Sequence, residues 1–366
     1  MNKFMPIFAI VMILAVSGCV GGGSGITTDG SGNGLEITDF SSDLTDVYSG
    51  KTTRIMMTIE NQGDVEVNMD KGLALLIGGY DWDIGTQTRV QELKKDLMAA
   101  DPTREIPAGT SLFKWTLTAP DYPRGQSKTD QMIGRVYYDY ETKAVGSVWA
   151  YPAGEAAAAR DAKESLQTST FQSTKGPVSL EVSVSPDPVE FETFNDYFTL
   201  YVKVSNVGGG KIYKPDIVTS SCSKFTEATS CINQGCYPIY DEVEGIVTFN
   251  SCSDCASIPV ANCVAPYTTS GCVAGTACTG TIKAHDVAED DLNKPTIIID
   301  LSKSNGLVLQ DSTCLNDIEV IGGITTVICD VTLSEIPTTK RSYPITVIAD
   351  YGYYKDTELS LNVFGK

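Results

Sequence analysis

Short strand-like runs fill most of this 366-residue chain. Each run is four to ten residues long and rich in β-branched and aromatic types, and turn sequences such as NQGD and PAGT separate them. In the first half the runs are GLEITDF, TTRIMMTIEN, GLALLIGG, SLFKWTLTA, MIGRVYYDY and AVGSVWAY. Several short strands separated by turns are typical of β-sandwiches. The pattern therefore predicts an all-β fold.

The same plan recurs in the second half of the chain. IMMTIENQGDVEV aligns with LYVKVSNVGGGKIY and pairs Asn61 with Asn206. Near each end, VYYDYETKAVGSVWA aligns with VIADYGYYKDTELSLNVF and pairs Asp139 with Asp350. The two landmarks are 78 residues apart in the first copy and 144 in the second, so the second carries 66 extra residues. The sequence therefore predicts two tandem units and an insertion in the second.

The strand that ends in N-x-G, the segment IPAGTSLFKWTLTAP and the closing YDY strand resemble CARDB-type and related immunoglobulin-like domains. Such domains occur in exported archaeal and bacterial surface proteins. The resemblance implies two tandem immunoglobulin-like β-sandwiches, at residues 35–152 and 177–366. It also implies a role as a stalk, spacer, adhesive module or protein-contact module.

Two stretches have helix-forming composition. In the predicted linker, residues 153–176, the first half is rich in alanine and the second half is polar. TRVQELKKDLMAA, residues 88–100, is a second predicted helix, which Asp101-Pro102 would end.

The predicted insertion, residues 214–295, is rich in cysteine. Its eight cysteines are Cys222, Cys231, Cys236, Cys252, Cys255, Cys263, Cys272 and Cys278. The segment around them has little apolar material, so we expect disulfides to stabilise it, with the pairing left open. A zinc site or a redox-active pair at Cys252 and Cys255 is the alternative. The other spacings lack a matching metal half-site, and no βαβ pattern surrounds the pair.

Cys314 and Cys329 lie beyond this group. A hairpin turn centred on Ile321-Gly322 would place them directly opposite each other. Facing residues at a non-hydrogen-bonded antiparallel pair have Cα atoms about 4.5 Å apart, which a disulfide can bridge. We therefore predict a Cys314–Cys329 disulfide.

The remaining cysteine, Cys19, follows an apolar run from Phe4 to Val16. Thirteen residues are too few to span a bilayer, so residues 1–18 are predicted to be a secretory signal peptide. The residues Val16 to Cys19 resemble the lipobox of prokaryotic lipoproteins. That resemblance implies cleavage before Cys19 and attachment of a lipid to its sulfur. The alternative is an ordinary cleaved signal with an unrelated cysteine nearby. Residues 19–34 are rich in Gly and Ser and form a predicted tether.

The charge excludes some partners. Lys and Arg number 27 against 46 Asp and Glu, a formal net charge of −19. Nucleic acid requires clustered cations, so we expect no nucleic-acid binding. The charge also disfavours adsorption to anionic lipid, which leaves Cys19 as the expected attachment to the membrane.

Catalytic and metal motifs are scarce. The single histidine, His285, cannot supply a metalloprotease motif or a serine triad, and no cofactor is expected. Asp81 and Asp83, with DVAEDD at 286–291, are candidate Ca²⁺ ligands, although solvated acidic turns are the favoured interpretation. Aromatic residues at alternating strand positions are interpreted as sandwich core rather than as a sugar-binding face. These include Trp82, Trp115, Trp149 and the tyrosines of YDY and YGYY.

Together these features predict a lipid-anchored extracytoplasmic protein on the cell surface or in a periplasm-like space. We expect a non-catalytic adhesion or binding module whose partner is an envelope protein or glycan. The insertion is the expected recognition surface, because loops on rigid β scaffolds often carry function. The alternatives are a structural envelope spacer and a secreted hydrolase or thiol oxidoreductase.

Overall fold

The computed structural model describes residues 34–85, 87–193, 196–215, 287 and 289–366, together with the backbone of 237–243 and 246–253. The strands are β1 (Leu35–Ser42), β2 (Asp46–Tyr48), β3 (Thr52–Asn61), β4 (Gly72–Gly78), β5 (Val90–Glu92), β6 (Thr110–Thr118), β7 (Ser127–Pro152), β8 (Thr170–Ser173), β9 (Val178–Ser185), β10 (Val189–Phe191), β11 (Tyr197–Asn206), β12 (Lys211–Tyr213), β13 (Tyr237–Val243), β14 (Ile246–Ser253), β15 (Thr296–Asp300), β16 (Leu307–Leu309), β17 (Ile324–Leu333) and β18 (Arg341–Phe364). The helices are α1 (Ala153–Asp161) and the 3₁₀ turns η1 (Met69–Lys71), η5 (Glu289–Asp291), η6 (Ser312–Leu315) and η7 (Ile321–Gly323).

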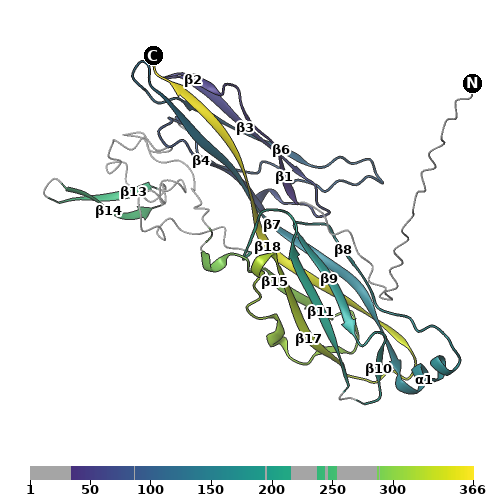
Figure 1. Ribbon diagram of the computed structural model, residues 1–366. Coiled ribbons are helices and arrows are strands. Elements are labelled where there is room, and N and C mark those ends of the chain that lie inside the picture. Colours follow the sequence, from purple (N-terminus) through teal and green to yellow (C-terminus); the bar gives the residue numbers. More distant parts are fainter. Residues whose placement is uncertain are drawn as a thin grey trace, which may run out of the picture.

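Two long strands, β7 and β18, run through the length of the molecule (Figure 1). They pair antiparallel from Ser127 with Phe364 to Ala150 with Arg341, with no break in register. At ~3.3 Å per residue, the 26 residues of β7 span roughly 85 Å. This ribbon is the centre of a nine-stranded sheet.

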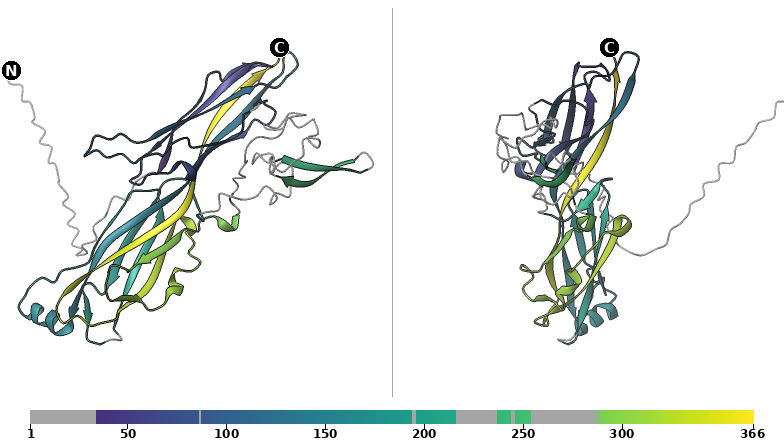
Figure 2. Two further views of the ribbon diagram at one scale, coloured as in Figure 1. Left: turned by 180° about the vertical axis from the view of Figure 1, so that it is seen from behind. Right: turned by 90° about the vertical axis from the view of Figure 1, so that its left-hand side faces the viewer.

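Two smaller sheets cover the nine-stranded sheet, one at each end of the molecule (Figure 2). The three-stranded sheet β1-β3-β6 lies at one end, which we call the first end, and the four-stranded sheet β16-β17-β11-β9 lies at the other, the second end. The even-numbered apolar side chains of β7, from Met132 to Ala150, are buried in one cluster with the inward residues of both smaller sheets. A Cβ on Gly134 would lie within 3.0 Å of Phe40 and Met57, which shows how closely the layers pack. We call this buried side of the central sheet the inner face.

Each end of the molecule contains strand residues from both halves of the sequence. The first part of β7 pairs with β4, and its second part continues into the other end beside β8 and β10. In the opposite direction, β18 begins beside β15 and ends parallel to β2, where Asn362 pairs with Asp46. The second part of β7 therefore completes the second end, and the last part of β18 completes the first end. We call this arrangement strand exchange.

The expectation of an all-β fold is confirmed for the described residues, since α1 is their one α-helix. MIGRVYYDY and AVGSVWAY, predicted as two strands, form the single strand β7. The division into units 35–152 and 177–366 remains a prediction. The helix α1 lies in the predicted linker at 153–176.

The predicted helix at 88–100 is wrong. This segment contains β5, which pairs with β4 at the sheet edge, and its remaining residues are extended or turn-like. Leu93 packs over Gly72, where a Cβ would lie 2.4 Å from the leucine methyl group. Tertiary pairing of this kind overrides intrinsic helix propensity.

Strand exchange predicts that both ends unfold together. Trp115 lies at the first end and Trp149 at the second, so variants that retain one of them as the sole tryptophan report on each end separately. Their denaturant unfolding curves should coincide. Val363 is fully buried at the first end. Its replacement by alanine should lower the free energy of unfolding by about 2 kcal/mol and shift both midpoints to lower denaturant concentration. Two separate midpoints, or a shift seen at one end alone, would contradict shared unfolding.

Candidate functional site

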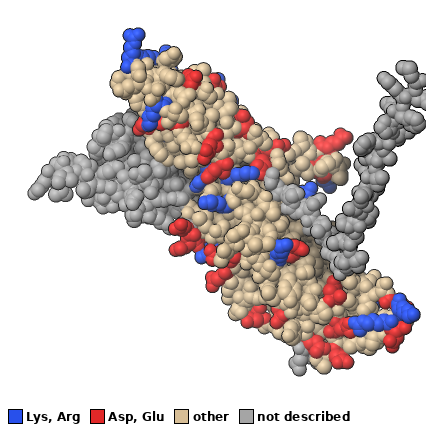
Figure 3. All heavy atoms as spheres, viewed as in Figure 1, with Lys and Arg blue, Asp and Glu red and all other residues tan. Residues whose placement is uncertain are grey.

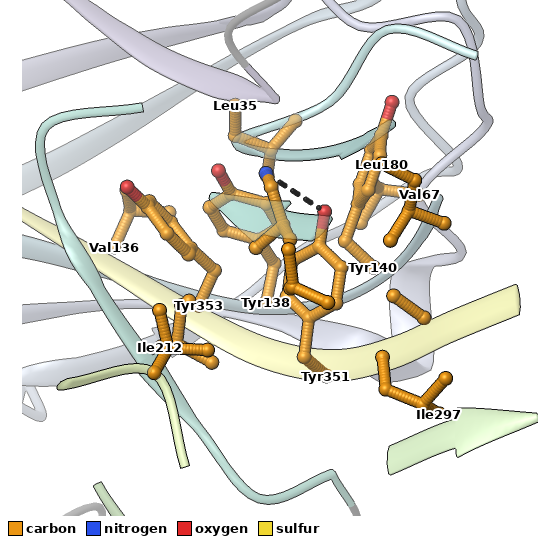
Figure 4. Close-up of a cluster of buried hydrophobic side chains, with 14 of the residues drawn as sticks. Leu35, Val67, Val136, Tyr138, Tyr140, Leu180, Ile212, Ile297, Tyr351 and Tyr353 are labelled. Atoms are coloured by element: carbon orange, nitrogen blue, oxygen red, sulfur yellow. Dashed lines mark hydrogen bonds between the residues drawn. The ribbon is translucent and has the colours of Figure 1, made fainter. Parts of the chain in front are cut away.

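Four tyrosines meet on the inner face at the middle of the ribbon (Figure 4). Tyr138 pairs with Tyr353 and Tyr140 with Tyr351 across the two strands. Neighbouring ring centroids are 5.7–6.4 Å apart, which is within the range of favourable aromatic contact. We call these residues the central tyrosine ring.

Two tyrosines of this group also accept hydrogen bonds from the two turns that follow β3 and β11. The Tyr140 hydroxyl accepts from Val65 N at 3.1 Å, and the Tyr353 hydroxyl accepts from Gly210 N at 2.7 Å. Asn61 donates from Nδ2 to the Val65 carbonyl at 2.8 Å, and Asn206 donates in the same way to the Gly210 carbonyl at 2.9 Å. The two asparagines that align in sequence therefore close equivalent turns. The alternating pattern of the strands indicates these tyrosines as core residues, but it carries no signal for their hydrogen bonds to the turns.

Burial raises the pKa of Tyr140 to about 12 and that of Tyr353 to about 12. Tyr138 and Tyr351 are more deeply buried, and desolvation raises the pKa of each well above its ordinary value. All four therefore favour the neutral phenol in the folded state.

These pKa values predict alkaline destabilisation. The unfolded chain releases phenolic protons near pH 10, whereas the folded state holds those of Tyr140 and Tyr353 until about pH 12. The associated stability should be complete below pH 10 and decline as the pH rises toward 12. Absorbance at 295 nm and the free energy of unfolding, both measured from pH 8 to 12, test this. Tyr353→Phe should remove one late-titrating phenol; an unchanged titration curve would refute the assignment.

A second aromatic group lies on the opposite, outer face of the ribbon. Tyr137, Tyr213 and Tyr354 pack together with centroids 5.3–6.4 Å apart, over Leu73 and Leu75 of β4. We call this set the outer aromatic cluster. It joins β4, β7, β12 and β18 at the middle of the molecule.

Arg135 covers this cluster. Its guanidinium lies 4.3 Å from the Tyr354 ring centroid and donates two hydrogen bonds to Asp356, at 2.6 and 2.8 Å. It also donates to the Tyr137 hydroxyl at 3.0 Å. Burial lowers the pKa of Arg135, but the bonds to Asp356 and Tyr137 more than offset this and raise it above its ordinary value. The planar guanidinium thus combines stacking on an aromatic ring with paired hydrogen bonds to a carboxylate.

The predicted insertion joins the scaffold at the outer aromatic cluster. Tyr213 and Leu292 form a β-bridge, and Lys214 N donates to the Asp291 carbonyl at 2.9 Å. Asn293 N donates to the Ile212 carbonyl at 2.8 Å. Val287 and Leu292 pack against the cluster from the returning chain. The chain therefore leaves the scaffold and returns at adjacent positions, which we call the insertion root.

Most of the predicted cysteine positions lie outside the described residues. Cys252 is in β14, where Pro238 pairs with it across the β13–β14 hairpin. The other seven cysteines of the insertion, together with Cys19 and His285, lie outside the residues that the structure describes. Their predicted roles remain predictions.

Cys314 and Cys329 form a disulfide with an S–S distance of 2.03 Å and Cα atoms 5.5 Å apart. The bonded pair is the predicted one, but the predicted hairpin is absent. Cys314 lies in η6, and the strand residue paired with Cys329 is Leu200 of β11. The bond instead fastens a cap, residues 310–323, to β17. Val320 of this cap is buried and donates its N–H to the Asn293 carbonyl beside the insertion root, at 2.8 Å.

Removal of the disulfide should destabilise the fold. The bond closes a loop with a sequence separation of 15, for which restriction of the unfolded chain gives about 3 kcal/mol. A Cys314→Ser, Cys329→Ser double variant should lose about that much free energy of unfolding in denaturant titration. Adding reductant to this variant separates any effect of the remaining cysteines. A double variant as stable as the native protein would show that the cap is held by packing alone.

Two of the candidate Ca²⁺ ligands, Asp81 and Asp83, form other contacts. Asp81 pairs with Lys128 at 2.7 Å, and the same ammonium lies 2.9 Å from Asp130. Asp83 accepts the Gly85 N–H within its own turn, at 2.8 Å. Within the described ranges, no group of three or more potential metal-binding side chains is found. On the face drawn in Figure 3, acidic and basic side chains are interspersed along the molecule.

No family model matches the chain, and no curated protein matches its sequence. In the part of the chain that the structure describes, no helix is long and apolar enough to cross a membrane. The candidate site is therefore defined by geometry alone. It consists of the insertion root and the outer aromatic cluster that holds it.

Proposed function

We propose that this chain is a lipid-anchored extracytoplasmic surface protein. It acts as a non-catalytic binding module, and the insertion at residues 214–295 is its recognition element. The lipobox-like residues before Cys19 support the anchor, and cysteine clustering in an exported chain supports a cross-linked insertion. The partner is an envelope protein or glycan.

We further propose that the body consists of two immunoglobulin-like units with exchanged closing strands. Equivalent contacts in the two halves support this. The Val65 N–H bonds to the Tyr140 hydroxyl at 3.1 Å, and the Gly210 N–H bonds to the Tyr353 hydroxyl at 2.7 Å. A tyrosine that ties its hydroxyl to an upstream turn is also a feature of immunoglobulin-like sandwiches.

The insertion root is the observation that carries the recognition assignment. The two chain ends are fixed side by side by backbone hydrogen bonds, over an aromatic cluster clamped by Arg135 and Asp356. Such a root can present a large loop without altering the strands beneath it. Function on rigidly supported loops is a common arrangement.

Deletion of the insertion tests this function. Because Lys214 and Asp291 are already hydrogen-bonded neighbours, an Asn-Gly turn can replace residues 215–290. The variant should keep the β-rich circular dichroism spectrum and the Cys314–Cys329 disulfide, but lose binding to isolated cell envelopes of the source organism. The measurement is a pull-down with labelled protein, compared with the full chain.

The matched control is Glu181→Ala, Lys203→Ala, which removes an exposed ion pair on β9 and β11 and leaves the insertion root intact. It should bind envelopes as the native protein does. A correctly folded deletion variant that still binds fully would overturn the recognition role and favour a structural spacer, which the elongated body would also suit.

A further inference from the structure

One edge of β18 has a gap in its strand pairing. On this edge β12 pairs with β18 as far as Tyr354, and β2 pairs with it from Asn362 to Phe364, beside the carboxyl end of the chain in Figure 1. Among the described residues, no strand pairs with residues 355–361 on this side. At ~3.3 Å per residue, this stretch is roughly 23 Å long. We call it the open edge.

The open edge presents backbone hydrogen-bonding groups. Because the register between β18 and β7 is unbroken, successive residues of β18 direct their N–H and C=O groups alternately toward β7 and away from it. The Asn362 N–H and the Phe364 carbonyl both bond to residues that flank β2, at 2.7 and 2.9 Å, so the even-numbered residues face away from β7. Asp356, Glu358 and Ser360 therefore direct their backbone groups to the open edge. These residues are exposed, and no described backbone group bonds to them from that side.

The side chains beside the open edge favour a basic partner. Glu358 accepts a hydrogen bond from Gln131 Nε2 at 2.6 Å, and Asp46 of β2 accepts one from Asn362 Nδ2 at 2.8 Å. Both carboxylates are exposed, and in the part of the chain that is described these partners are neutral amides. On the other side of the strand, Leu359 is partly buried against the core. An added strand with alternating basic and apolar residues would therefore match both sides of the sheet.

A second copy of this chain does not match the open edge. Antiparallel pairing of two such edges about their midpoint would place the Glu358 side chains of both copies directly opposite each other. Like charges at this cross-strand position are destabilising. The occupant that the charges favour is therefore a segment of a different protein.

We propose that the open edge binds an extended, basic segment of a partner protein by strand addition. Backbone hydrogen bonds to Asp356, Glu358 and Ser360 hold the segment, and its Lys or Arg side chains pair with Glu358 and Asp46. The added strand fills the gap between β12 and β2 in the central sheet. The scaffold itself makes this contact, so the proposal does not depend on the recognition role of the insertion.

Three synthetic peptides test the proposal on the purified full chain. The first has seven residues that alternate Val and Lys, with Lys at the centre. The second has Glu in place of each Lys. The third keeps every Lys, but the backbone nitrogens of the central Lys and the following Val are methylated, which removes the donors that strand pairing needs in either direction. Fluorescence anisotropy should show binding of the first peptide, and at least tenfold weaker binding of the other two.

A pair of charge variants separates the open edge from general attraction to an acidic protein. Glu358→Lys should weaken binding of the first peptide at least tenfold. Glu335→Lys makes the same change in net charge at an exposed position in the turn between β17 and β18, and should leave binding within twofold of the native value. Both sites are exposed, and circular dichroism checks that both variants fold.

Several results would overturn the proposal. These are no binding of the first peptide, equal binding of the methylated peptide, or equal loss in the two charge variants. Binding seen only when residues 215–290 are replaced would assign the open edge to the chain's own insertion instead. A dimer in sedimentation analysis that Glu358→Lys abolishes would assign it to a second copy.

Discussion

The antiparallel pairing of β7 with β18 is the interaction on which the rest of the structure depends. It runs from Ser127 with Phe364 to Ala150 with Arg341, and every other strand of the nine-stranded sheet is added directly or indirectly to these two. Both smaller sheets pack against the ribbon and share its buried side chains. A defect in this pairing would therefore remove support from both ends at once.

The middle of the ribbon carries different chemistry on its two faces. The central tyrosine ring on the inner face holds two polypeptide turns through phenolic hydroxyls. The outer aromatic cluster is covered by a guanidinium and holds the insertion root. Alternation of side chains along a strand allows neighbouring residues such as Tyr137 and Tyr138 to serve these separate purposes. This short stretch of sequence therefore supports the two turns on one face and the insertion root on the other.

Periodicity allowed much of this fold to be predicted, and its limits have physical causes. The strand β3 was recognisable from its alternation, and Asn61 and Asn206 were correctly aligned, because both features depend on local pattern. The exchange of closing strands was not predictable, since a strand that continues and a strand that turns back can share one alternating pattern. The bonded cysteines Cys314 and Cys329 were named correctly for an incorrect geometry. For the site, the sequence indicated the inserted segment, whereas the outer aromatic cluster depends on long-range pairing that local pattern does not encode.

Strand exchange also has a consequence for the order of synthesis. The sheet at the first end needs the last residues of the chain, because β2 runs parallel to the final residues of β18 and the first part of β7 pairs with them. Until those residues emerge, the amino-terminal half has exposed strand edges and an incomplete core, a state that is prone to aggregation. Folding of this protein therefore cannot proceed from the amino-terminal half to completion before the carboxyl-terminal residues have been made.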